Sequence, residues 1–152
     1  MRFIADFMLG KLARMLRLLG QDVIYVRPAD RNGMLKMALE EGRVILTRSH
    51  KLPHHPSIFI IKSQDWREQL EEVKKAFPLD INPFTRCSIC NTKLVEVPKP
   101  EVRGKVPYHV YEAHDEFAYC PGCGRYYWKG THYENIKKML GIEDANNGTP
   151  NN

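Results

Sequence analysis

The amino-acid sequence predicts an α/β protein with a small, mostly parallel sheet flanked by helices, followed by a cysteine-rich module. In the first half, short apolar runs alternate with segments of helical periodicity, as in parallel sheets covered by helices. This alternation stops near residue 80, and all four cysteines lie beyond residue 86. We therefore expect an α/β domain over residues 1–80, a cysteine module with a terminal helix over residues 81–140, and a polar, disordered tail over residues 141–152.

The first domain is expected to follow the order β-α-β-α-β-β-α. The first helix has Leu9, Leu12, Leu16 and Leu19 on one face, and Gly20 is suited to end it. Apolar runs without this periodicity are typical of buried strands. The expected strands are residues 2–6, 22–26, 43–47 and 57–61. The expected helices are residues 8–19, 30–42 and 64–77.

The second domain is expected to contain short strands around two cysteine pairs. Aromatic residues are frequent here, and the strand candidates alternate apolar and polar positions. The final element is a helix over residues 131–140. The expected strands are residues 93–97, 108–113, 116–120 and 125–129.

Composition and charge restrict the class of protein. Hydrophobic residues make up 43% and charged residues 27% of the 152 residues, which is typical of a globular chain. No apolar run approaches the roughly 20 residues of a membrane helix, and the N-terminus lacks the pattern of a signal peptide, so a cytoplasmic protein without membrane contact is expected. The net charge of +5 is compatible with a nucleic-acid partner without establishing one.

The cysteines form two identical pairs, Cys87-x-x-Cys90 and Cys120-x-x-Cys123, separated by 29 residues. This spacing is typical of a tetrahedral Zn²⁺ site, in which each pair presents two thiolates from a tight turn. Four thiolates fill the coordination shell, so the zinc is expected to be structural. An iron–sulfur cluster and redox-active thiols are the alternatives for the same spacing.

Acidic residues follow three of the expected strands. Asp6 ends the first strand, Asp30 comes after the second, and Asp65 comes after the fourth. The carboxyl ends of parallel strands share one edge, where ligands bind in open α/β sheets. Asp6 and Asp30, with Asp65 as a third candidate, are therefore predicted to hold Mg²⁺ or Mn²⁺ for phosphodiester hydrolysis. Helix capping is the alternative role for Asp30 and Asp65.

Basic residues accompany these acids. Lys11, Arg14 and Arg17 recur every three residues on the first helix, and Arg31 and Arg48 follow strands at the acidic edge. Positive charge beside a metal site suits a phosphate backbone, so these five residues are candidates for contact with a nucleic-acid backbone. A solvated helix face is the alternative explanation for the first three.

Several segments together resemble the Mut7-C RNase domain family. They are "FIADFMLGKLARMLRLLGQDVIY", "LKMALEEGRVILTR", "SQDWREQL" and "CPGCGRYYWKGTHYENI", and the resemblance spans about residues 2 to 140. It implies a PIN-like α/β fold with a zinc ribbon, a metal-dependent ribonuclease activity, and an acidic cluster that includes Asp6 and Asp30. It also implies that Cys87, Cys90, Cys120 and Cys123 bind the ribbon zinc.

One position departs from the family pattern. The third strand usually ends in "LTRD", whereas this chain reads "LTRS", with Ser49 in place of the aspartate. A hydroxyl does not supply the negative charge that concentrates a divalent ion. An RNA-binding protein with weakened or lost nuclease activity is therefore the alternative function, and a protein-interaction adaptor is a third hypothesis. His50, His54 and His55, just downstream, are weaker candidates to replace the missing ligand.

Overall fold

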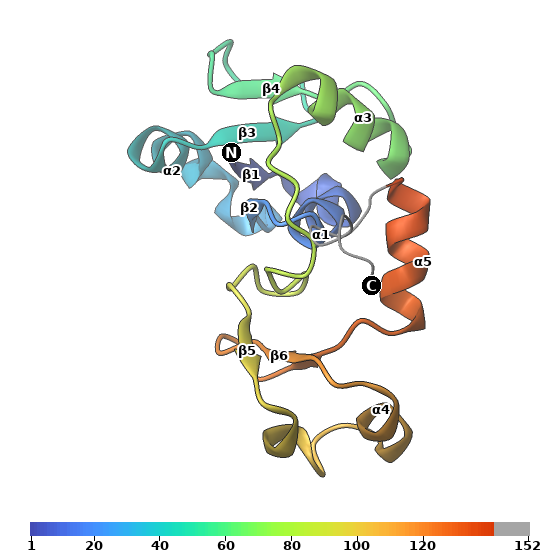
Figure 1. Ribbon diagram of the computed structural model, residues 1–152. Coiled ribbons are helices and arrows are strands. Elements are labelled where there is room, and N and C mark those ends of the chain that lie inside the picture. Colours follow the sequence, from blue (N-terminus) through green and yellow to red (C-terminus); the bar gives the residue numbers. More distant parts are fainter. Residues whose placement is uncertain (142–152) are drawn as a thin grey trace. The chain divides into compact units, whose positions relative to one another are not determined.

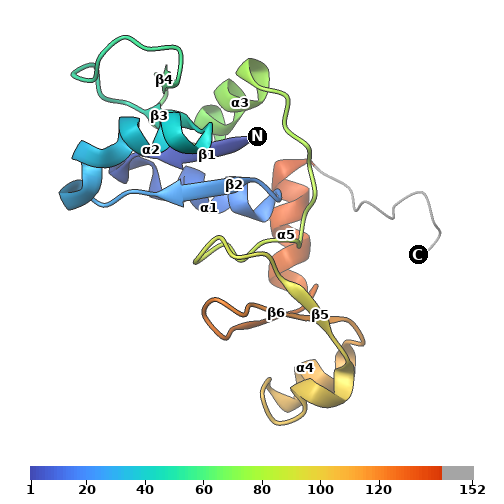
Figure 2. The same cartoon turned by 90° about the vertical axis from the view of Figure 1, so that its left-hand side faces the viewer.

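The computed structural model describes residues 1–141, apart from the side chain of His132. The expected tail beyond Gly141 lies outside the described residues. The chain divides into two compact units, Met1–Ile81 and Asn82–Asn152, and each unit is described by itself (Figures 1 and 2). The first holds a four-stranded parallel sheet with helices, and the second holds a small antiparallel sheet. The predicted fold class is confirmed.

The parallel sheet has the order β2-β1-β3-β4. Its strands are β1 (Arg2–Ala5), β2 (Asp22–Tyr25), β3 (Val44–Thr47) and β4 (Ile58–Ile60). The chain moves from β1 to one side to form β2, then crosses back to form β3 on the other side. The topology therefore reverses between β1 and β3, and this reversal point is where ligands bind in such sheets.

Helices connect and cover these strands. A 3₁₀ helix (Phe7–Leu9) leads into α1 (Gly10–Leu18), and a second 3₁₀ helix (Pro28–Gly33) leads into α2 (Met34–Glu41). After β4 comes α3 (Trp66–Ala76), which packs on α1. Because the two crossovers run in opposite directions and are right-handed by rule, α1 and α3 cover one face of the sheet and α2 covers the other.

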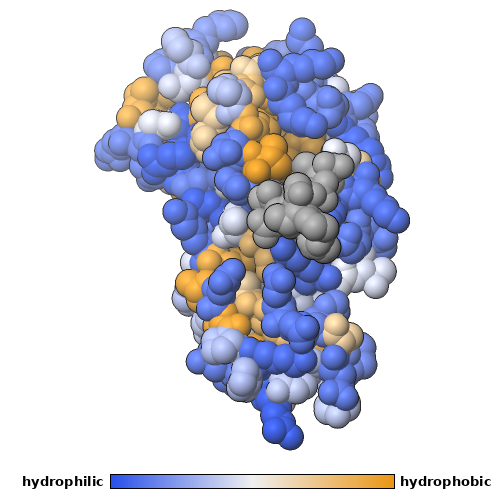
Figure 3. All heavy atoms as spheres, in the orientation of Figure 1, coloured by the Kyte–Doolittle hydropathy of each residue, from blue (hydrophilic) through white to orange (hydrophobic). Residues whose placement is uncertain are grey.

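Apolar side chains fill both faces of the sheet. On the α2 face, Ile4 and Ile45 from the strands pack with Val26, Met34 and Ala38. On the outside, hydrophilic residues prevail over the coloured atoms of the face seen in Figure 3. No helix of residues 1–141 combines the length and the apolar character needed to cross a bilayer.

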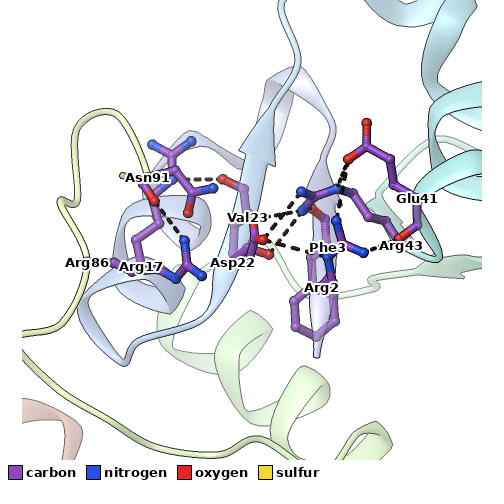
Figure 4. Close-up of polar contacts among 9 residues, drawn as sticks. All are labelled: Arg2, Phe3, Arg17, Asp22, Val23, Glu41, Arg43, Arg86 and Asn91. Carbon is purple, nitrogen blue, oxygen red and sulfur yellow. Dashed lines mark hydrogen bonds and ion pairs between the residues drawn. The ribbon is translucent and has the colours of Figure 1, made fainter. Parts of the chain in front are cut away.

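A charged network around Asp22 and Arg43 closes the amino end of the sheet (Figure 4). The side chain of Arg43 is only 6% exposed. Its Nη1 donates to Asp22 Oδ1 at 2.8 Å and to the Phe3 carbonyl at 3.1 Å, and its Nε donates to Glu41 Oε1 at 2.7 Å. These bonds connect β1, β2 and the end of α2, so the network is structural.

The second unit is built around an antiparallel sheet of order β5-β6-β7. The strands are β5 (Val95–Val97), β6 (Phe117–Tyr119) and β7 (Tyr126–Tyr127), and α5 (Thr131–Leu140) follows them. Between β5 and β6 lie a 3₁₀ helix (Lys99–Val102) and α4 (Tyr108–Ala113). A small core of Val102, Val110 and Phe117 holds these parts together.

The strand predicted over residues 108–113 is wrong, because this segment is the helix α4. Its alternating apolar and polar residues fit a strand, but Pro107 precedes it, and the Pro107 carbonyl accepts hydrogen bonds from the amides of Val110 and Tyr111. The helical turn buries Val110 in the small core and leaves Tyr108 74% exposed. Local tertiary packing therefore overrides the strand propensity.

Candidate functional site

Asp6 occupies the reversal point of the sheet. It follows β1 directly, and its amide donates to the Leu46 carbonyl of β3 at 2.9 Å, which extends the pairing of the two strands past their ends. Its side chain caps the 3₁₀ helix by accepting from the Phe7 amide. The residue is fully buried. A buried carboxylate at the carboxyl edge of a parallel sheet must be paired, because isolated burial of a charge is costly.

Arg31 and Thr47 supply that pairing. Arg31 Nε donates to Asp6 Oδ1 and Arg31 Nη2 donates to Asp6 Oδ2, both at 2.9 Å. The Thr47 hydroxyl donates to Oδ2 at 2.8 Å, and the Phe7 amide donates to Oδ1 at 2.9 Å. Burial by itself raises the pKa of Asp6, but the hydrogen bonds from Arg31, Thr47 and Phe7, with the charge of Arg31, outweigh it and hold the pKa below its usual value.

The other two predicted acids do not gather around Asp6. Asp30 lies inside the 3₁₀ helix Pro28–Gly33 and pairs with Arg27 at 3.1 Å, so it does not cap α2, whose N-cap is Gly33. Asp65 caps α3 by accepting from the Arg67 amide at 3.1 Å. The capping alternative thus describes Asp65 and not Asp30. Within residues 1–141, the cysteines are the only group of three or more metal-binding side chains whose ligand atoms converge.

The Asp6 edge, as folded, does not fit a divalent cation. A carboxylate has about four acceptor positions, and Asp6 uses all of them for Arg31, Thr47 and Phe7. A Mg²⁺ or Mn²⁺ ion needs free oxygen ligands, and here a guanidinium already neutralises the carboxylate. A cation could bind Asp6 only after one of these donors has left.

Ser49 contributes to the turn after β3. Its amide donates to the Thr47 hydroxyl at 3.0 Å, and its own hydroxyl accepts from the Lys51 amide at 3.2 Å. The nearby His55 accepts from the Ser57 amide through Nδ1. Neither residue supplies a charged ligand to the edge. Sequence analysis missed Thr47, although a hydroxyl at the last position of a buried strand is a signal that it needs a partner at that edge.

The five basic residues predicted to contact RNA differ in their exposure to solvent. Lys11 and Arg14 are exposed on α1, Arg31 is 29% exposed, and Arg48 is partly buried. Arg17 is buried, and its Nε donates to the Val23 carbonyl at 2.9 Å (Figure 4). The prediction that Arg17 shares a solvent-facing stripe is therefore wrong, because its guanidinium folds back onto β2.

Two cations flank Trp66 at the start of α3. Lys11 Nζ lies 5.8 Å and the Arg67 guanidinium 4.7 Å from the centre of its ring. Arg48 donates from Nη2 to the Lys62 carbonyl at 3.2 Å. Its Nε is a buried nitrogen without a partner among the described residues. Lys11, Arg48 and Arg67 thus supply positive charge in the segments that follow β1, β3 and β4.

The four cysteines converge in the second unit. Their sulfurs all lie within 4.8 Å of one another, with Cys87 and Cys123 at 3.7 Å and Cys90 and Cys120 at 3.3 Å. A tetrahedron with Zn–S bonds of about 2.3 Å has about 3.8 Å between sulfurs. The geometry therefore fits a zinc ion bound by all four thiolates.

Hydrogen bonds from neighbouring hydroxyl groups contact the sulfurs of this candidate zinc site. The Thr92 hydroxyl lies 3.2 Å from Cys90 Sγ. Hydrogen bonds, chiefly with Thr92, lower the pKa of the Cys90 thiol to about 6, while burial raises the pKa of Cys120 to about 12. The Tyr127 hydroxyl lies 2.8 Å from Cys87 Sγ. Such outer contacts orient ligand sulfurs and raise metal affinity.

Comparison with known proteins agrees with the fold and with the cysteine geometry. A search of curated proteins found no match. The model of one protein family, described as the Mut7-C RNAse domain, matches residues 1–140 and so includes both the sheet edge around Asp6 and the four cysteines. This chain therefore belongs to the Mut7-C RNAse domain family.

Proposed function

We propose that this chain hydrolyses phosphodiester bonds of RNA at the carboxyl edge of its parallel sheet, with Asp6 as the central acid. The family's description as an RNAse domain indicates a ribonuclease-type function and implies RNA as the substrate. The observation that supports the position of the site is the buried Asp6 carboxylate at the reversal point between β1 and β3. Ligands bind at such points in parallel α/β sheets.

Dependence on Mg²⁺ or Mn²⁺ belongs to this proposal as an expectation from the family resemblance. It requires Asp6 to be released from Arg31, since the carboxylate has no free acceptor position in the folded chain. Asp30 and Asp65 remain secondary candidates for catalysis. Both are exposed, and their side chains are 56% and 49% accessible to solvent.

RNA would be held at the same edge by cations. Lys11, Arg31 and Arg48 come from the segments after β1, β2 and β3, and Arg31 contacts Asp6 directly. Arg14 lies three residues further along α1, about 4.5 Å by helix rise. Partial neutralisation of phosphates by such residues makes binding weaken as salt increases. Lys105 and Lys129, which lie over the rings of Tyr126 and Phe84, are the candidates for RNA contact in the second unit.

The test uses zinc-loaded protein and labelled single-stranded RNA with Mn²⁺. We expect cleavage by the native chain and loss of at least tenfold in rate for Asp6→Asn. The matched control is Asp80→Asn, which removes the same charge from the same unit but lies far along the chain from the strand ends. Equal cleavage by native and Asp6→Asn proteins would show that Asp6 is not catalytic.

A second candidate function is RNA binding with weakened or lost cleavage. It is favoured by the pairing of Asp6 with Arg31, and by the neutral Ser49 at the position where the family resemblance leads us to expect an aspartate. It predicts RNA affinity that falls with salt and does not depend on Mg²⁺. Ser49→Asp separates the two functions, because a large gain in cleavage would identify the native chain as impaired.

A further inference from the structure

Two exposed aromatic side chains flank Asp6 at the carboxyl edge of the parallel sheet. Phe7 follows Asp6 directly and is 36% exposed, and Tyr25, which ends β2, is 40% exposed. Tyr25 lies in register with Ala5, the residue before Asp6, so both rings come from backbone next to that acid. Among the described residues, one other aromatic side chain is exposed, Tyr108 in the second unit. Exposed rings are thus brought together at the end of the sheet where ligands bind.

The ring of Tyr25 is held in place although it is exposed. Its hydroxyl donates to the Phe7 carbonyl. The ring also lies against Gly10 at the start of α1, where a Cβ would be 3.5 Å from the Tyr25 hydroxyl oxygen and 3.6 Å from two ring carbons. A ring fixed in this way loses little conformational freedom when a ligand stacks on it.

Arg31 supplies positive charge beside these rings. Its Cζ lies 5.4 Å from the centre of the Phe7 ring. A guanidinium carries five N–H groups, and Asp6 accepts from Nε and Nη2 at 2.9 Å. The remaining three N–H groups donate to no acceptor among the described residues, and the side chain is partly exposed. Asp6 therefore fixes the orientation of a guanidinium whose unused donors suit a phosphate.

We propose that Phe7, Tyr25 and Arg31 form a nucleotide subsite that selects single-stranded RNA: an unpaired base stacks on the exposed rings, and the unused N–H groups of Arg31 bind a neighbouring phosphate. The inference rests on the proposed function in taking RNA as the ligand, and it requires neither cleavage nor a divalent cation. Arg31 keeps its pairing with Asp6 while it binds the phosphate.

The chemistry of the subsite explains the preference for a single strand. Every base has a face that can stack on an aromatic ring, so such a platform holds RNA without reading its sequence. In a duplex the bases are already stacked and paired, so their faces are not available to Phe7 and Tyr25. Duplex RNA offers only its phosphates to this edge.

The experiment measures the affinity of the full, zinc-loaded chain for labelled RNA by fluorescence anisotropy, without added Mg²⁺ or Mn²⁺. One probe is a single strand without self-complementarity, and the other is the same strand annealed to its complement. Phe7→Leu and Tyr25→Leu keep an apolar side chain but remove the ring. Each should weaken single-strand binding at least fivefold and duplex binding less than twofold.

Two controls accompany these variants. Tyr25→Phe keeps the ring and should bind the single strand within twofold of the native affinity. Tyr108→Leu removes the exposed ring of the second unit and should bind both probes as the native chain does. Thermal unfolding of each variant shows that the affinities are measured on folded protein.

Salt dependence separates stacking from phosphate binding. Loss of one phosphate contact reduces the slope of log affinity against log salt concentration by about 0.7 for a single strand. Arg31→Gln should show this reduction, whereas Phe7→Leu should keep the native slope, because stacking releases no counterion. Lys75→Gln removes an equal charge from the last turn of α3 and should keep both the native slope and the native affinity.

The proposal is overturned if Phe7→Leu and Tyr25→Leu bind the single strand as tightly as the native chain, or if they weaken single-strand and duplex binding equally. Cleavage assays with Mn²⁺ distinguish this from failure of the proposed function. Ring-dependent binding without any cleavage would leave the subsite standing and remove the ribonuclease proposal. Cleavage that depends on Asp6, with native RNA affinity in Phe7→Leu and Tyr25→Leu proteins, would do the reverse.

Discussion

Arg31 and Asp6 form a two-pronged ion pair at the carboxyl edge of the sheet, with both nitrogen–oxygen distances at 2.9 Å. The two residues are 25 positions apart and come from the segments after β2 and β1. In this pair, Arg31 neutralises the buried carboxylate of Asp6 at the reversal point of the sheet. Its properties can be measured without knowing the substrate.

The first prediction concerns the pH dependence of stability. The pKa of Asp6 is lower in the folded chain than the value of about 3.9 in an unfolded one. Its stabilising contribution is therefore present above pH 4 and is lost as the pH falls through the folded pKa. The difference in unfolding free energy between the native chain and Asp6→Asn should shrink as the pH falls from 6 to 2.5. Urea titrations at each pH measure it, and a constant difference would contradict the prediction.

The second prediction concerns Arg43 at the opposite end of the sheet. Arg43→Gln should destabilise the chain by about 3 kcal/mol, because it leaves Asp22 and the Phe3 carbonyl without their buried donor. Arg27→Gln, which breaks the exposed pair with Asp30, should cost less than about 1 kcal/mol. Urea unfolding measures both variants. Equal losses would mean that the Arg43 network contributes no more than a surface pair.

The third prediction concerns removal of zinc. Chelation at neutral pH should unfold the second unit and leave the first unit folded, because four thiolates without metal no longer hold the turns around the small core. The two tryptophans report this separately. In Trp66→Phe protein the fluorescence of Trp128 should change on chelation, while in Trp128→Phe protein the fluorescence of Trp66 should not.

The fourth prediction concerns Gly122 in the second cysteine turn. A Cβ at this position would lie 2.2 Å from Thr92 Oγ1 and 3.1 Å from Cys90 Sγ, so Gly122→Ala should displace Thr92 and weaken zinc binding at least tenfold. Gly33→Ala is the matched control, since nothing lies within 4 Å of its Cβ position. Competition with a chromophoric chelator gives both affinities. Similar affinities for the two variants would show that the Thr92 contact does not matter.

The fifth prediction concerns the hydroxyl beside Cys87. Burial and the hydrogen bond to Cys87 raise the pKa of Tyr127, so the hydroxyl stays protonated and can donate to the thiolate. Tyr127→Phe should lower zinc affinity by about tenfold. Tyr126→Phe removes a neighbouring hydroxyl and should leave the affinity unchanged. The same chelator competition measures both, and an unchanged Tyr127→Phe affinity would exclude the donor role.

Much of the fold could be predicted because its signals are local. The leucines of α1 repeat at helical spacing, and Gly42 ends α2 in the left-handed conformation that glycine adopts most readily. The cysteine spacing is a short-range pattern that predicts its own geometry. The strand predicted over residues 108–113 failed because packing of Val110 with Val102 and Phe117 selects a helix where the alternating pattern favours a strand.

The sequence by itself determined the order of strands and α-helices in the first unit, the acid at the end of β1 and the two cysteine pairs of the candidate zinc site. Only the tertiary structure decided which groups these charged side chains pair with. It turned Arg17 back onto β2, paired Asp30 with Arg27, made Asp65 the cap of α3, and paired the Asp6 carboxylate with Arg31 and Thr47. The physical reason is that a buried charge must be paired wherever the fold places it, and its partner is the cation that the chain crossings bring within hydrogen-bonding distance.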